Sequence, residues 1–103
     1  MKKAPYPIDL SAMQAALKDH RRGLGKETEQ RHYVNEVRLI NFAVTGNSLG
    51  CYRDLPITRE LTRAIRRVVC KNIKLIKLHV AYEDRKPSCR KLFLQITTTE
   101  VKK

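Results

Sequence analysis

The 103-residue sequence lacks a long apolar run. No stretch approaches the roughly 20 apolar residues that a membrane-spanning helix needs, which argues against a membrane protein. The first ten residues, MKKAPYPIDL, contain two lysines but no apolar stretch of the roughly 7–15 residues that is typical of a secretion signal. We therefore expect a cytoplasmic protein.

Paired cysteines and glycine-rich motifs are also missing. The three cysteines are Cys51, Cys70 and Cys89, an odd number without a Cys-x-x-Cys pair, so we expect neither a disulfide framework nor a zinc site. Gly46 and Gly50 lack the Lys and Ser/Thr that complete a phosphate-binding loop. We expect reduced thiols, no metal and no cofactor.

Acidic residues are scarce: 10 Asp and Glu stand against 22 Lys and Arg, giving a net charge of +12. Residues 57–103 alone contain 13 basic and 4 acidic residues, a net charge of +9. So few carboxylates argue against a metal-dependent nuclease, which gathers several of them around its ions. The positive excess attracts nucleic acid, anionic membranes and acidic proteins alike. Charge alone does not choose among these partners.

The hydrophobic pattern predicts two helices and three strands. Apolar residues at intervals of three and four indicate helices, while runs of β-branched and aromatic residues indicate strands. We expect helices over residues 9–22 and 58–71 and strands over residues 32–44, 73–82 and 91–98. An extended arm over residues 1–8 precedes them, and a frayed basic tail over residues 100–103 follows.

The order helix–strand–helix–strand–strand predicts a single α+β domain over residues 9–99. A right-handed βαβ crossover, followed by a hairpin across the polar segment 83–89, gives a three-stranded mixed sheet packed against two helices. The apolar residues of the first strand switch faces between Leu39 and Ile40. A β-bulge and a homodimer interface both explain this switch.

At about 100° per residue, the segment 58–71 places apolar side chains on one side of its helix and arginines on the other. The side expected to pack on the core contains Leu61, Ala64, Ile65 and Val68, extended by Ile57, and the other side contains Arg59, Arg63, Arg66 and Arg67. Guanidinium groups suit phosphate because their planar fork donates two hydrogen bonds at once. A solvated surface is the alternative, although like charges four residues apart repel each other. Asn72 is expected to end this helix.

The open face of the predicted sheet is a second candidate surface. Lys77 and His79 on one strand would neighbour Lys91 and Phe93 on the next, so that bases stack on the ring and phosphates meet the cations. Alternatively, the first helix or a second copy of the chain covers Phe93. The predicted nucleic-acid contacts are Arg59, Arg63, Arg66, Arg67, Lys71, Lys74, Lys77, Arg90, Lys91 and Phe93.

These patterns predict a small, basic, non-enzymatic protein that binds DNA or RNA through phosphates, as a regulatory or accessory factor. One alternative is a protein-interaction module, an inhibitor or adaptor, that docks on an acidic surface of a larger partner. Another is a metal-independent ribonuclease in which His79 transfers protons and Arg90 stabilises the developing phosphate charge. Lys77 and Tyr82 would complete that set.

Overall fold

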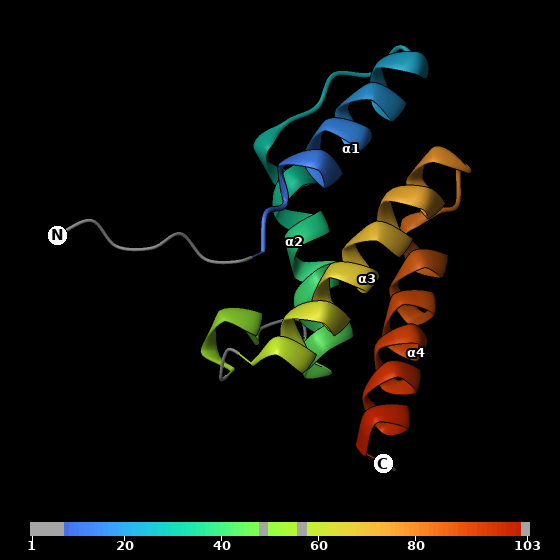
Figure 1. The fold of residues 1–103 in the computed structure, drawn as a ribbon. Coiled ribbons are helices and arrows are strands. Elements are labelled where there is room, and N and C mark those ends of the chain that lie inside the picture. The colour runs from blue at the N-terminus through green and yellow to red at the C-terminus, as the bar shows by residue number, and fades with distance from the viewer. Residues whose placement is uncertain (1–7, 48–49, 56–57, 102–103) are drawn as a thin grey trace, which may run out of the picture.

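All regular elements among the described residues of the computed structural model, which are 8–47, 50–55 and 58–101, are helical (Figure 1). For residues 99–101 the description is limited to the backbone. The elements are α1 (Ser11–Gly23), α2 (Gln30–Thr45), the 3-10 helix η1 (Tyr52–Asp54), α3 (Arg59–Lys77) and α4 (Tyr82–Val101). The predicted α+β fold with a three-stranded sheet is therefore wrong, while the predicted helices over 9–22 and 58–71 are present as α1 and the first part of α3.

Helix α2 replaces the strand predicted over residues 32–44. Its buried apolar side chains are Leu39, Ile40, Ala43 and Val44, a spacing that forms one stripe on a helix. The switch of faces at Leu39 and Ile40, for which a strand would need a bulge or a dimer interface, is ordinary helical periodicity. The helix begins with reciprocal hydrogen bonds between Glu29 and His32 and ends at Gly46, whose φ of 80° is in the left-handed region.

Helix α3 runs beyond the predicted end of its segment. The Thr58 hydroxyl caps its first turn by accepting a hydrogen bond from the Leu61 amide at 3.0 Å. Asn72, expected to end the helix, is instead fully buried within it. The chain leaves the helix through His79, which has a φ of 64°. Ile57, expected to extend the apolar side, lies outside the described residues.

Helix α4 replaces the strand predicted over residues 91–98, the polar turn over 83–89 and the end of the strand over 73–82. The buried side chains Arg85, Cys89, Phe93 and Ile96 recur at intervals of three and four, which places them on one side of a helix. Pro87 lies inside α4 and removes the amide that would bond to the carbonyl four residues earlier. That carbonyl belongs to Glu83, which is exposed, so a water molecule can donate the hydrogen bond instead.

The predicted terminal segments fall partly outside the described residues. Of the arm over 1–8, the structure describes Ile8, which is buried in the core. Of the tail over 100–103, the backbone of residues 100–101 continues α4, and residues 102–103 are not described.

Helix α3 packs against α1, α2 and α4, and α2 also packs against α4. In Figure 1, α3 and α4 lie side by side as a helical hairpin joined by a short turn. One hydrophobic core fills the space between the four helices. Its fully buried side chains include Met13 from α1, Leu39 and Ile40 from α2, Ile65 and Val68 from α3, and Cys89 from α4.

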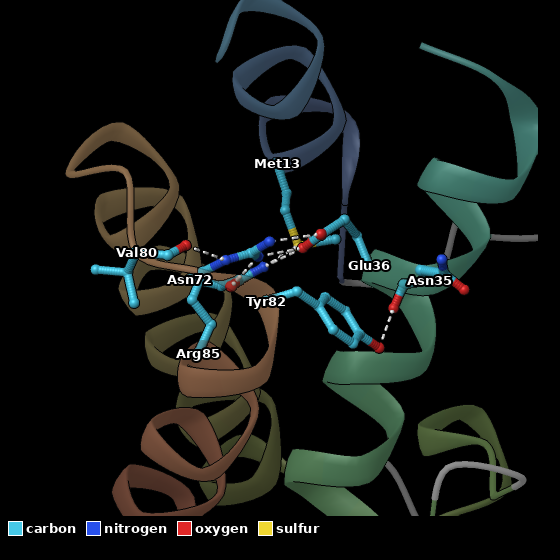
Figure 2. Close-up of polar contacts among 7 residues, drawn as sticks. All are labelled: Met13, Asn35, Glu36, Asn72, Val80, Tyr82 and Arg85. Carbon is cyan, nitrogen blue, oxygen red and sulfur yellow. Dashed lines mark hydrogen bonds and ion pairs between the residues drawn. The ribbon is translucent and has the colours of Figure 1, made fainter. Parts of the chain in front are cut away.

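A buried ion pair crosses this core (Figure 2). Arg85 donates from one terminal nitrogen to Glu36 Oε1 at 2.6 Å and from the other to Oε2 at 2.9 Å. The first of these nitrogens also donates to Asn72 Oδ1 at 2.9 Å, and Arg85 Nε donates to the Val80 carbonyl at 3.1 Å.

The amide of Asn72 completes the network. Asn72 Nδ2 donates to Glu36 Oε1 at 2.9 Å and contacts Met13 Sδ at 3.3 Å (Figure 2). We name these four side chains the Arg85 network: Met13 from α1, Glu36 from α2, Asn72 from α3 and Arg85 from α4. The two charges thus have several partners each, which the burial of an ion pair requires.

We expect Arg85→Met to lower the free energy of unfolding by about 3–5 kcal/mol, because it leaves the buried Glu36 carboxylate without its counter-charge. The double variant Arg85→Met/Glu36→Leu should be more stable than Arg85→Met, since it also removes the stranded charge. Arg90→Met, on the same helix but only half-buried, is the matched control. Urea denaturation checks all three. A free energy of unfolding for Arg85→Met within about 1 kcal/mol of the wild type would contradict the network.

Candidate nucleic-acid interface

The outer side of α3 is a continuous cationic surface. Every lysine and arginine of this helix is exposed, and at about 100° per residue they fall within an arc of about 140°. We name these residues the α3 cationic face: Arg59, Arg63, Arg66, Arg67, Lys71, Lys74 and Lys77. The opposite side buries Ala64, Ile65 and Val68, and this anchors the helix with its cations outward.

The length of the helix enlarges this surface beyond the arginines near its N-terminus. Lys74 and Lys77, predicted on a strand, lie in α3 and are exposed beside the arginines. From Arg59 to Lys77 the helix rises about 27 Å at 1.5 Å per residue. Glu60 is the one acidic residue of α3. The face is therefore a strongly basic strip along one side of the helix.

The α3 cationic face borders a shallow groove of about 920 Å³ that reaches Leu92 on α4. Its remaining lining residues are Thr58, Thr62 and Cys70. Among the described residues, no aromatic ring, no carboxylate and no Asn or Gln side chain lines it. Such a surface supplies donors for phosphate oxygens but few groups that read base edges.

The structure does not bring three of the predicted contacts to this face. Phe93 is 7% exposed and packs in the core, so with the sheet absent the predicted stacking platform does not form. Arg90 donates a hydrogen bond to the Ala43 carbonyl at 3.0 Å, at the C-terminal end of α2. Lys91 is exposed on α4 and lines a different groove.

The side chains of the ribonuclease alternative are divided among three places. His79 and Tyr82 line one pocket, whereas Arg90 lines the groove beside α2 and Lys77 belongs to the α3 cationic face. Burial raises the pKa of Tyr82, and its hydroxyl donates to the Asn35 carbonyl at 3.0 Å. The described residues contain no group of three His, Cys, Asp or Glu side chains that could hold a metal ion.

The sequence patterns missed an encounter between His20 and His79, which lie 59 positions apart. His20 Nε2 and His79 Nδ1 are 2.9 Å apart, and the ring centroids are separated by 4.8 Å. Local periodicity carries no signal for this contact, because it depends on how α1 packs beside the turn between α3 and α4.

No protein-family model matches the chain, and neither a curated protein nor a solved structure is significantly similar to it. Within the part of the chain that the structure describes, no helix combines the length and the apolar character needed to cross a membrane.

The cysteines provide a chemical test of which side of α3 faces water. We expect Cys70, exposed on the α3 cationic face, to react rapidly with Ellman's reagent in the native protein. Burial raises the pKa of Cys89 to about 11, so its thiol should react only after unfolding. Cys51 is half-buried and should fall between the two. Mass spectrometry of the labelled peptides gives the order, and native Cys89 labelling as fast as Cys70 would contradict this packing.

Proposed function

We propose that this protein binds double-stranded nucleic acid through the phosphate backbone, with the α3 cationic face as its contact surface and without catalysing a reaction. The observation that carries the proposal is the exposure of seven lysines and arginines on one side of a single helix. Guanidinium groups donate paired hydrogen bonds to phosphate oxygens, and ammonium groups add compact charges.

The stability of the isolated helix does not account for this arrangement. Arg59, Arg63 and Arg67 follow one another at intervals of four residues, where like charges destabilise a helix by a few tenths of a kcal/mol per pair. Lys71 continues the series. A polyanion along the helix offsets this repulsion, which is a physical reason for the sequence to carry it.

A duplex fits this surface better than a single strand does. Single strands are held by bases stacked on aromatic rings, and the described lining of the groove has none. The helix presents its cations over a length of about 27 Å, close to the axial length of eight base pairs at about 3.4 Å each. The lack of amide side chains in the lining favours binding without strong sequence preference.

We expect the affinity for a DNA duplex of about 25 base pairs to fall with salt at a log–log slope near −4 to −5, if about four to six phosphates are neutralised. The triple variant Arg67→Ala/Lys71→Ala/Lys74→Ala should bind at least about tenfold more weakly and lose about 2–3 units of that slope. Fluorescence anisotropy at several ionic strengths measures both.

The matched control removes the same charge from α1 and α2: Lys18→Ala/Arg22→Ala/Arg38→Ala changes three cations that are exposed in the structure. It should change affinity much less than the α3 variant does. Equal losses in the two variants would mean that net charge alone attracts the duplex. Tighter binding of a single strand of the same length would overturn the preference for duplexes.

A groove between α2 and α4 favours a second function, docking of a partner protein. Its apolar floor contains Phe42, Pro87 and Leu94, and Leu94 is 44% exposed. The Lys86 ammonium lies 5.0 Å from the centre of the Phe42 ring, and Arg90 and Lys91 also line the groove, which has a volume of about 720 Å³.

The chemistry of this groove selects an acidic amphipathic helix as its occupant. Three cations and no carboxylate line it among the described residues, so acidic side chains complement its rim, while apolar side chains cover its floor. A helix packs naturally into the furrow between two helices. A second copy of the chain would bring the same cations together and is disfavoured.

We expect a synthetic peptide of about 16 residues, with leucines at helical spacing and glutamates between them, to bind at least about fivefold more tightly than a scrambled peptide of the same composition. Leu94→Ser should abolish this difference. Leu78→Ser, which changes a leucine that is 62% exposed outside the groove, should preserve it. Equal binding of the two peptides by the wild type would reduce the interaction to charge attraction and contradict the docking site.

A further inference from the structure

The three histidines of the chain all line one pocket of about 260 Å³. His20 belongs to α1, His32 to the first turn of α2 and His79 to the turn between α3 and α4. The pocket shares no residue with the groove at the α3 cationic face. It is a separate site, and neither the duplex proposal nor the docking groove uses it.

Hydrogen bonds within the pocket hold its donors in place. His32 Nδ1 accepts from the Glu29 amide at 2.9 Å, so the neutral ring carries its proton on Nε2, where it can be donated. The Arg21 guanidinium donates from Nε and from one terminal nitrogen to the Glu27 carbonyl, at 3.1 and 2.8 Å. The bond between His20 and His79 uses one nitrogen of each ring, which leaves the second nitrogen of each outside that bond.

The charges that line this pocket are nearly all positive; outside the lining, the Glu29 carboxylate accepts a hydrogen bond from the His32 amide and pairs with Arg31 at 2.9 Å. Arg21, Lys26 and Arg85 line the pocket, and Glu36 is its one carboxylate among the described residues. Glu36 is already bound by Arg85 and Asn72. Tyr82, whose pKa is raised, adds a neutral hydroxyl. An anion in the pocket would offset this concentration of positive charge.

The pKa of His20 is lowered by the same excess of positive charge. Burial lowers its pKa, and the neighbouring His79, Arg85, Arg21 and Lys26 lower it further. A bound anion opposes these effects because it favours the protonated imidazole. By linkage, the affinity for an anion of constant charge must rise as the pH falls through the range in which His20 takes up its proton.

From this convergence of donors and cations we infer that the pocket between α1, α2 and the α3–α4 turn binds a phosphate group. A volume of about 260 Å³ is below the roughly 300–1,000 Å³ of sites for drug-sized ligands. It suits inorganic phosphate, or the phosphate of a small ester or of a strand end. His20, His79, His32 and Lys26 are its ligands, and Arg21 supports them electrostatically.

Titration of the full-length protein with inorganic phosphate tests the site, with the Cε1–Hε1 NMR signals of the histidines as the readout. We expect saturable shifts of all three histidines. His32→Gln and Lys26→Ala should each weaken binding at least about fivefold, as expected when a charge-assisted hydrogen bond is lost. The triple variant of the α3 cationic face described above should bind phosphate as the wild type does.

Two further experiments identify the source of the phosphate and measure how its binding depends on pH. A 5′-phosphorylated oligonucleotide that displaces inorganic phosphate, where its 5′-hydroxyl counterpart does not, identifies a strand end. Equal behaviour of the two assigns the site to free phosphate or small esters. Sulfate, whose charge is constant over this range, should bind about tenfold more tightly near pH 5.5 than near pH 7.5 if His20 takes up a proton on binding.

Non-saturating shifts that chloride reproduces at matched ionic strength would overturn the inference. So would unchanged phosphate affinity in both His32→Gln and Lys26→Ala. If one variant fails to fold, the other still tests the site. A variant is folded if the NMR signals of its buried methyl groups match those of the wild type.

Discussion

The buried ion pair between Arg85 and Glu36 is the interaction on which the rest of this structure depends. Both residues are at most 5% exposed, and taking two charges out of water costs several kcal/mol for each ion unless each is fully hydrogen-bonded. Asn72 and the Val80 carbonyl supply the remaining bonds. Because these partners come from α2, α3 and the turn before α4, the network satisfies its charges only when the helices adopt one arrangement.

That arrangement decides what α3 presents to solvent. Asn72 lies on the buried side of α3, so its bonds to Arg85 and Glu36 fix the rotation of the helix as well as its position. The lysines and arginines of the α3 cationic face then point away from the core. The apolar residues Ala64, Ile65 and Val68 favour the same rotation through burial. Polar and hydrophobic contacts thus agree on which side of the rod is exposed.

The sequence predicted the helix that carries the arginines because the apolar and charged residues of 58–71 both follow a 3.6-residue period. The same rule applied to Leu39, Ile40, Ala43 and Val44 would have identified α2. There, β-branched and aromatic composition suggested a strand, and this preference depends on context more than periodicity does.

Helix α4 was harder to recognise from local patterns. Pro87 and a run of charged residues are typical of a turn. The buried side of α4 also includes Arg85, and arginine is almost never buried without a partner. Its partner Glu36 lies 49 positions away. No local rule connects the two, and the same holds for the approach of His20 to His79.

The proposed functions share one electrostatic origin. A chain with a net charge of +12 repels itself in its compact form, and the Arg85 network, the α3 cationic face and the histidine pocket distribute this charge differently. In the core, the charge of Arg85 is neutralised by the Glu36 carboxylate. On α3 it is exposed along a rod suited to a polyanion, and in the pocket it converges on a volume suited to one small anion.

Hydrogen exchange of the Arg85 side chain tests the central claim most directly. In ¹⁵N-edited NMR spectra, the Nε proton of a guanidinium that is buried and bonded to Glu36, Asn72 and Val80 should exchange with water at least about a hundredfold more slowly than those of Arg59 and Arg67 on the surface. Slow exchange at Arg85 alone would place it in the core as described here. Exchange as fast as that of the α3 arginines would show that no buried ion pair holds the helices together.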